Sequence, residues 1–267
     1  MLKDITLGQY FPGNTVVHRL DPRTKLLMVV VYIVALFLAK WWVSYGVMLA
    51  FLVTAVMLSH IKPKALFRGL KPLIVIMVFT ALINLFYSDG EVLVKFWIFR
   101  ITREGIVQAA FLVLRIMMLV TGTFLLTYTT SPIALTDGME SLLSPLKKLH
   151  FPVHELSMMM SIALRFIPTL IEETDKIMSA QKARGADFES GNIFRRAKAL
   201  VPILVPLFVS AFRRADELAT AMECRCYHGD EGRTKLKQLH YRARDIITLL
   251  LGAALLGGII TLRCFGL

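Results

Sequence analysis

Five apolar runs, separated by polar sequence, constrain what this 267-residue chain can fold into. They cover residues 26–39, 43–58, about 72–87, 106–128 and 246–262. A helix of about 20 residues crosses a bilayer, and a chain that is 56% hydrophobic is too apolar for an ordinary soluble domain. We therefore expect an all-α integral membrane protein with about five transmembrane helices and a cytoplasmic layer of long helices.

The basic charge of the chain predicts its orientation in the membrane. The formal net charge is +12, and residues 62–71, read as a loop, carry four cations and no acid. Cytoplasmic loops are rich in Lys and Arg. The aromatic residues lie mostly in apolar runs rather than among cations, which argues against nucleic acid as a partner. Counting spans from a cytoplasmic N-terminus predicts spans within 1–128, a cytoplasmic domain over 129–243 and a last span within 244–267, with the C-terminus outside.

Local signals predict where several helices begin. Asp21 is a good N-cap in front of Pro22, and Ser131 stands in the same relation to Pro132. We expect helices to start at both prolines, and the second helix to cover residues 132–149.

Two further segments have distinct patterns. The connection over residues 88–105 contains an alternating run, which fits either a small extracellular hairpin or an interfacial segment. In the cytoplasmic domain, apolar residues at helical spacing predict one long helix that opens at Pro152 and another over roughly 193–227. Prolines inside these helices should kink them without ending them.

A short pattern occurs twice in the cytoplasmic domain. Residues 175–185 and 216–226 each contain Asp, an aliphatic residue and Ala, followed by an arginine between small residues. A single arginine, Arg184 or Arg225, would be explained by the helix dipole, which favours a cation at the C-terminal end. Two copies at the same spacing favour a paired docking function, because a planar guanidinium suits a carboxylate in a partner's pocket.

Patterns for catalysis and metal binding are weak. There is no Walker A motif, so we do not expect the chain to bind and hydrolyse ATP alone. Cys224 and Cys226 are interpreted as small helix-end residues rather than a metal pair. His150 and His154 flank a proline in a turn, and a membrane enzyme that uses them is one alternative function. No metal or cofactor is expected.

Arg115 lies inside the fourth apolar run. An arginine within the membrane is costly, so it should face protein or water and have a partner. A structural role, such as hydrogen bonding to neighbouring carbonyls, is the favoured interpretation. The alternative is a stand-alone permease with its substrate site at Arg115.

Methionines are concentrated on the first long cytoplasmic helix. Met158, Met159 and Met160 are consecutive. They fit an ordinary core equally well, or a soft surface that re-packs against several different partners.

Five motifs together resemble a known family. They are HRLDPRTKL at residues 18–26, TTSP at 129–132, LRFIP at 164–168, AQKARG at 180–185 and MECRCY at 222–227. Over nearly the whole chain the sequence is similar to the transmembrane T component (EcfT) of energy-coupling-factor transporters, the ABC-type importers of vitamins and trace metals.

This resemblance implies a non-catalytic subunit of a bacterial cell membrane. In that family two coupling helices end in Ala-Arg-Gly-type motifs, each docks on one of two ATPase subunits, and the helices hold a membrane-embedded, substrate-binding S component. The implied ATPase-docking residues are Ala183, Arg184, Gly185, Cys224, Arg225 and Cys226. The implied S-component contacts are Met158, Met159, Met160, Leu164, Pro168 and Pro206. The cysteines that replace Ala and Gly in the second motif suit two non-identical ATPases, and the Met-rich helix resembles the shared, multi-substrate type.

Overall fold

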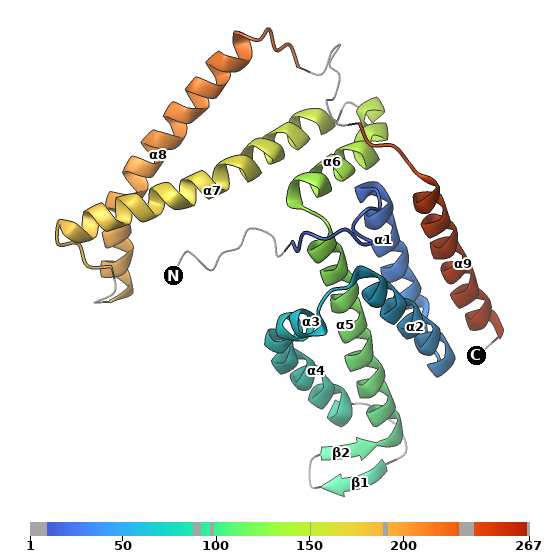
Figure 1. Ribbon diagram of the computed structural model, residues 1–267. Helices are drawn as coiled ribbons and strands as arrows, with labels where there is room; N and C mark the ends of the chain where they lie inside the picture. The colour runs from blue at the N-terminus through green and yellow to red at the C-terminus, as the bar shows by residue number, and fades with distance from the viewer. Residues whose placement is uncertain are drawn as a thin grey trace. The chain divides into compact units, whose positions relative to one another are not determined.

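The computed structural model describes residues 10–87, 92–96, 99–149, 151–188, 192–229 and 238–265 (Figure 1). Contacts within the chain divide it into two units. The membrane unit comprises Gly8–Met139 and Leu239–Leu267. The two-helix unit comprises Glu140–Gln238.

The membrane unit consists of helices and one short hairpin. Its elements are α1 (Pro22–Leu38), α2 (Trp42–Ser59), α3 (Pro63–Leu70), the 3-10 turn η2 (Lys71–Leu73), α4 (Ile74–Tyr87), β1 (Val92–Phe96), β2 (Phe99–Thr102), α5 (Arg103–Thr129), the first part of α6 (Pro132–Leu143) and α9 (Ala243–Phe265). β1 and β2 pair antiparallel. Of the two structures that the sequence allowed for residues 88–105, a hairpin or an interfacial segment, the described residues therefore form the hairpin.

The predicted all-α membrane fold is confirmed, with this hairpin as a small addition. Among the described residues, four helical segments are long and apolar enough to cross a membrane: Trp42–Ser59, Pro63–Phe86, Arg103–Thr129 and Ala243–Phe265. α1, the first predicted span, has 17 residues. It rises by about 26 Å, close to the ~30 Å hydrocarbon core of a bilayer.

Residues 62–71 do not form the predicted loop. That prediction is wrong, because α3 occupies Pro63–Leu70. Pro63 fits the first helical position, where no intrahelical N–H bond is needed. Leu66 and Leu70, one turn apart, are buried and give the helix an apolar side.

Both predicted N-caps are confirmed. Asp21 Oδ1 accepts a hydrogen bond from the N–H of Arg23 at 2.9 Å, and Ser131 Oγ accepts one from the N–H of Ala134 at 3.3 Å. α6, which follows Ser131, ends at Leu143, earlier than predicted, and the 3-10 segment η3 (Ser144–Leu149) continues the chain.

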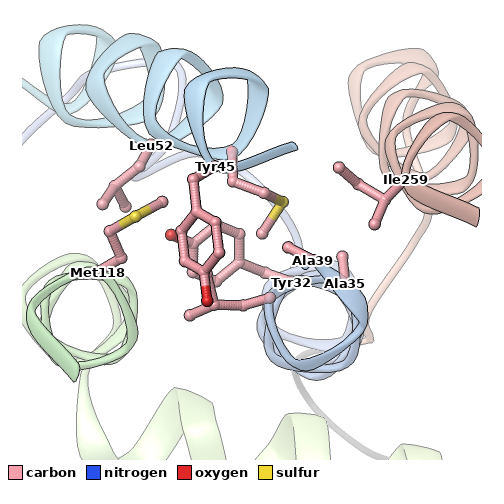
Figure 2. Packing of buried hydrophobic residues seen from close by; sticks show 9 residues of the cluster. Tyr32, Ala35, Ala39, Tyr45, Leu52, Met118 and Ile259 are labelled. Carbon is pink, nitrogen blue, oxygen red and sulfur yellow. The ribbon is translucent and has the colours of Figure 1, made fainter. Parts of the chain in front are cut away.

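The core of the membrane unit gathers side chains from four helices (Figure 2). Ile259 of α9 faces the small residues Ala35 of α1 and Ala39, the C-cap of α1, while Leu52 of α2 lies beside Met118 of α5. Lipid supplies no hydrophobic force between helices, so small residues that permit close packing contribute most to such contacts.

Buried polar groups join α1, α5 and α9 near their ends. The backbone N–H of Asp21 donates to Asp245 Oδ1 at 2.8 Å, and Asp245 Oδ2 accepts from the N–H of Arg242 at 2.9 Å. Lys25 Nζ donates to the carbonyl of Thr129 at 2.8 Å. We call Asp21, Lys25, Thr129 and Asp245 the polar cluster; all four are buried.

The two-helix unit contains the end of α6, η3, α7 (Val153–Ala183) and α8 (Ile193–Glu223). α7 and α8 are each 31 residues long. As predicted, the helices continue through their internal prolines, which are Pro168 in α7 and Pro202 and Pro206 in α8. α8 ends before the predicted boundary near residue 227.

Asp245→Ala should destabilise the membrane unit. The change leaves two backbone N–H groups without their acceptor, and we expect the free energy of unfolding to fall by about 2–3 kcal/mol. Thermal unfolding of the full chain in detergent measures this. Asp245→Asn keeps one acceptor oxygen and should cost less. Asp216→Ala, at an exposed position of α8, is the control, and equal losses at residues 216 and 245 would refute the prediction.

Candidate functional site: two equivalent helix ends

α7 ends in a Schellman motif at the first copy of the repeat. The N–H of Ala186 donates to the carbonyl of Gln181 at 3.0 Å, and the N–H of Gly185 donates to that of Lys182 at 3.0 Å. Gly185 has φ = +86°, a left-handed conformation that glycine adopts without a steric penalty. A Cβ at Gly185 would meet nothing within 4 Å, so the backbone alone accounts for the glycine.

α8 ends with the same pair of hydrogen bonds. The N–H of Tyr227 donates to the carbonyl of Met222 at 3.1 Å, and the N–H of Cys226 donates to that of Glu223 at 2.8 Å. Cys226 has φ = +54°. The second copy therefore has the backbone of the first, at a cost of about 1–2 kcal/mol for a non-glycine residue in this conformation.

Each motif presents its arginine to solvent. The six predicted docking residues are all exposed: Ala183, Arg184, Gly185, Cys224, Arg225 and Cys226. In the part of the chain that the structure describes, neither guanidinium has a side-chain partner. The partial negative charge of a helix C-terminus favours a cation there. Both cations remain free to bind an external acceptor.

An acidic side chain joins α7 to α8 inside the two-helix unit. Glu173 of α7 accepts a hydrogen bond from Ser210 Oγ at 2.5 Å and one from Arg214 Nη2 at 2.8 Å. The hydrogen bond from Ser210 and the charge of Arg214 hold the pKa of Glu173 below its ordinary value. We call these three residues the Glu173 bridge. Sequence reasoning missed this bridge, since Ser210 and Arg214 lie 37 and 41 residues from Glu173 along the chain.

Beside this bridge, α7 and α8 leave an apolar groove of about 260 Å³ between them. Phe166 and Leu170 of α7 face Leu218 and Met222 of α8 across it. The described parts of the two helices are therefore held together by the Glu173 bridge, by a hydrogen bond of 3.5 Å from Gln181 Nε2 to the carbonyl of Pro202, and by incomplete apolar packing.

α8 exposes a continuous apolar stripe. Its residues recur at three- and four-residue spacing, which places them on one side of the helix. They are Val201, Leu204, Val205, Phe208, Val209 and Phe212, each at least 46% exposed. We call this stripe the α8 apolar face. Exposed apolar surface of this kind marks a site of contact with a partner or a membrane.

The predicted S-component contacts lie on both helices. Met159 and Met160 are 55% and 53% exposed, so they are not core residues within this unit. Pro168 and Pro206 are exposed, and Met158 and Leu164 are half-buried. The α8 apolar face was not among the predicted site residues, although the spacing of its residues could have identified it.

Arg115 of α5 has partners inside the membrane unit. Its Nε donates to Tyr45 Oη at 2.8 Å, and its Nη2 donates to the carbonyl of Ala39 at 3.4 Å. The guanidinium also lies 5.8 Å from the ring centre of Phe37. These contacts link α5 to the ends of α1 and α2.

The histidine and cysteine candidates do not assemble a site in the described ranges. His154 Nδ1 lies 3.2 Å from Glu140 Oε1, and Glu140 Oε2 accepts from Ser157 Oγ at 2.7 Å, which joins α6 to α7. His150 lies outside the described residues. The three cysteines are exposed free thiols: Cys224, Cys226 and Cys264. No group of three or more His, Cys, Asp or Glu side chains that could hold a metal ion occurs among the residues that the structure describes.

Substitutions in the two caps should have opposite effects. Cys226→Gly removes the left-handed penalty and should stabilise the end of α8 by about 1 kcal/mol, while Gly185→Ala should destabilise the end of α7 by a similar amount. Hydrogen exchange of the amides at residues 226–227 and 185–186 measures both. Equal exchange in the variants and the original chain would contradict the prediction.

The Glu173 bridge should weaken in acid. A carboxylate with a lowered pKa contributes its stability above the ordinary value of 4.5 and loses it as the pH falls through the folded pKa. Spin labels are placed at residues 179 and 220 in a background with all native cysteines changed to serine. We expect the distribution of distances between the two labels to broaden below about pH 4.5. Glu173→Gln should show the broader distribution at neutral pH, and an unchanged distribution in that variant would count against the bridge.

Known proteins with similar sequences cover almost the entire chain. The CbiQ family profile, described as cobalt transport protein, matches residues 13–236. An energy-coupling factor transporter transmembrane protein EcfT from Thermosediminibacter oceani is 54% identical over 98% of this chain and 99% of its own. The EcfT of Acidaminococcus fermentans is 55% identical over 96% of this chain and 95% of its own. That of Bacillus subtilis is 50% identical over 96% of this chain and 98% of its own.

These matches span the membrane helices and both arginine-bearing helix ends. The resemblance seen in the motifs is therefore confirmed. Identity of 50% or more over nearly full length shows that the chain belongs to the EcfT family of energy-coupling factor transporter transmembrane proteins.

Proposed function

We propose that the chain couples ATP hydrolysis by two cytoplasmic ATPase subunits to uptake of vitamins or other micronutrients through interchangeable S components. The observation that carries this proposal is the pair of equivalent, exposed helix ends at Arg184 and Arg225. Hydrolysis belongs to the ATPases, and the chain is a non-catalytic subunit that needs no cofactor of its own.

Each helix end docks on one ATPase. The Schellman cap fixes where the arginine leaves the helix, so little backbone entropy is lost on binding. A guanidinium without an internal partner forms a bidentate pair with a carboxylate in the ATPase groove. Small neighbours, Ala183 and Gly185 in one copy and two cysteines in the other, let the groove walls approach the backbone. The difference between the copies suits two non-identical ATPases.

Movement passes from one helix to the other through the Glu173 bridge. When the ATPases close on ATP, displacement of either arginine moves its helix, and the bridge with Ser210 and Arg214 carries force to the other helix. The apolar groove beside the bridge leaves room for the helices to change their packing. α7 and α8 then act together on the protein that is bound to them.

The S component binds to the exposed apolar surface of α7 and α8. The α8 apolar face and the exposed methionines Met159 and Met160 need a partner to cover them. Methionine side chains adapt to differently shaped surfaces, which suits S components that exchange. We assign Met158, Leu164, Pro168 and Pro206 to the same contact.

The chain lies in a bacterial cell membrane, with its N-terminus and the two-helix unit in the cytoplasm and the C-terminus outside. Basic residues at the α2–α3 connection support this orientation. The rival function, a permease with a substrate site at Arg115, is not favoured, because Tyr45 and Ala39 already accept hydrogen bonds from this guanidinium.

Reversing both docking charges should separate the chain from its ATPases. In Arg184→Glu with Arg225→Glu, two anions replace two anchoring cations, and loss of an anchor worth about 2 kcal/mol lowers affinity about 30-fold. We expect co-purification of both ATPases and vitamin uptake to collapse, while the amount of chain in the membrane is unchanged. Each single variant should lose one ATPase more than the other.

Arg213→Glu is the matched control, since Arg213 is also exposed on α8 but lies outside the docking motif and the Glu173 bridge. It should retain both ATPases. Full transport by the double variant would overturn the proposed function.

A further inference from the structure

The connection from α2 to α3 forms a tight elbow. α2 ends at Ser59, and His60 follows in a left-handed conformation with φ = +53°. Its N–H donates to the carbonyl of Met57 at 3.2 Å. Pro63 then starts α3, so both helices lie close to the same turn.

One side of α3 is fixed against α5. Leu66 packs with Ile61 and Tyr128 in a buried cluster. Gly69 permits so close an approach to Phe124 that a Cβ there would lie 2.5 Å from the ring. Because α3 cannot shift towards α5 or away without losing this packing, the space that these two helices border is a stable feature.

A groove of about 640 Å³ lies between α2, α3 and α5. Its floor includes Leu52 and Met118, which are 6% and 1% exposed. Its sides include Val53, Met57 and Phe67, which are 42%, 71% and 71% exposed. The volume is within the range of ligand sites. We call this space the elbow groove, and its exposed walls belong to segments that are long and apolar enough to cross a bilayer.

The elbow groove has a cationic end. Lys62 supplies the positive charge there and His60 lines the same end; both are exposed. Residues 59–87 contain no acid. Three further basic residues are exposed and stand nearby in sequence but outside the lining: Lys64, Arg68 and Lys71. Within this stretch no carboxylate neutralises the positive charge.

We propose that the elbow groove binds one anionic phospholipid from the surrounding bilayer. An acyl chain covers Leu52 and Met118 and lies between the walls, and the phosphate group meets Lys62 and His60 at the open end. An apolar floor with a cationic end is complementary to a lipid of net negative charge. A zwitterionic lipid carries its own cation, which is repelled at the same end, so it binds with lower affinity.

Two other occupants match only half of the groove. A helix of a partner protein would cover the apolar floor but leave Lys62 at the end unexplained. A free phosphate would meet Lys62 but leave the floor uncovered. The lipid accounts for both halves, and the test separates the three.

Lipid retention by the full chain in detergent is measured by native mass spectrometry, with palmitoyl-oleoyl phosphatidylglycerol or phosphatidylcholine added. Phosphatidylglycerol should be retained about fivefold or more in preference to phosphatidylcholine. Lys62→Gln should reduce this preference about fivefold, the effect of one cation near a membrane surface. Val53→Trp fills the groove and should reduce retention of both lipids.

Lys64→Gln is the matched control, since it removes the same charge from the same elbow but lies outside the lining. It should leave the preference unchanged within about twofold, and thermal unfolding verifies that every variant is folded. Equal losses for residues 62 and 64, or full retention in Val53→Trp, would overturn the site. So would displacement of the lipid by glycerol 3-phosphate, or by a partner protein that occupies the groove.

Discussion

The membrane unit depends on the hydrogen bond from the backbone of Asp21 to the carboxylate of Asp245, between residues 224 positions apart in the chain. Apolar surface cannot hold helices together in lipid, because the tails are as apolar as the side chains. Buried polar groups that satisfy one another give three helix ends a defined meeting point instead. Lys25 adds the end of α5 through the carbonyl of Thr129. The small residues of α1 then allow close packing of α9 along its length, as the contact with Ile259 illustrates.

The two-helix unit follows the opposite logic. Its helices share the partly exposed Glu173 bridge and a hydrogen bond from Gln181, and the apolar stripe of α8 is exposed among the described residues of the unit. Such an arrangement is marginal alone, which makes it suited to changing shape. A rigid anchor and a deformable pair of helices are the two mechanical properties that the proposed coupling function requires.

Much of this organisation could be predicted from residues near each other in sequence. Apolar run lengths predicted the spans, and Asp21 and Ser131 predicted helix starts, because these signals are local. α3 was missed because the four cations of residues 62–71 indicated a loop and only two leucines in this short segment are buried. The polar cluster and the Glu173 bridge could not be predicted, since each joins distant segments by side chains that are individually ordinary. The left-handed Cys226 was also unforeseen, because a cysteine carries no signal for that conformation and only the match with the first cap explains it.

The common length of α7 and α8 has a further consequence. Each helix is 31 residues long; α7 ends one residue before Arg184, and α8 ends two residues before Arg225. A residue inserted into either helix would turn everything beyond it by about 100° and advance it by about 1.5 Å. The arginine would then point away from its original direction, although every local contact of the cap survived. Insertions and deletions in α7 or α8 are therefore limited to those that leave the arginine pointing in nearly its original direction around the helix axis. Changes that preserve this direction, such as seven or eleven residues, are tolerated best.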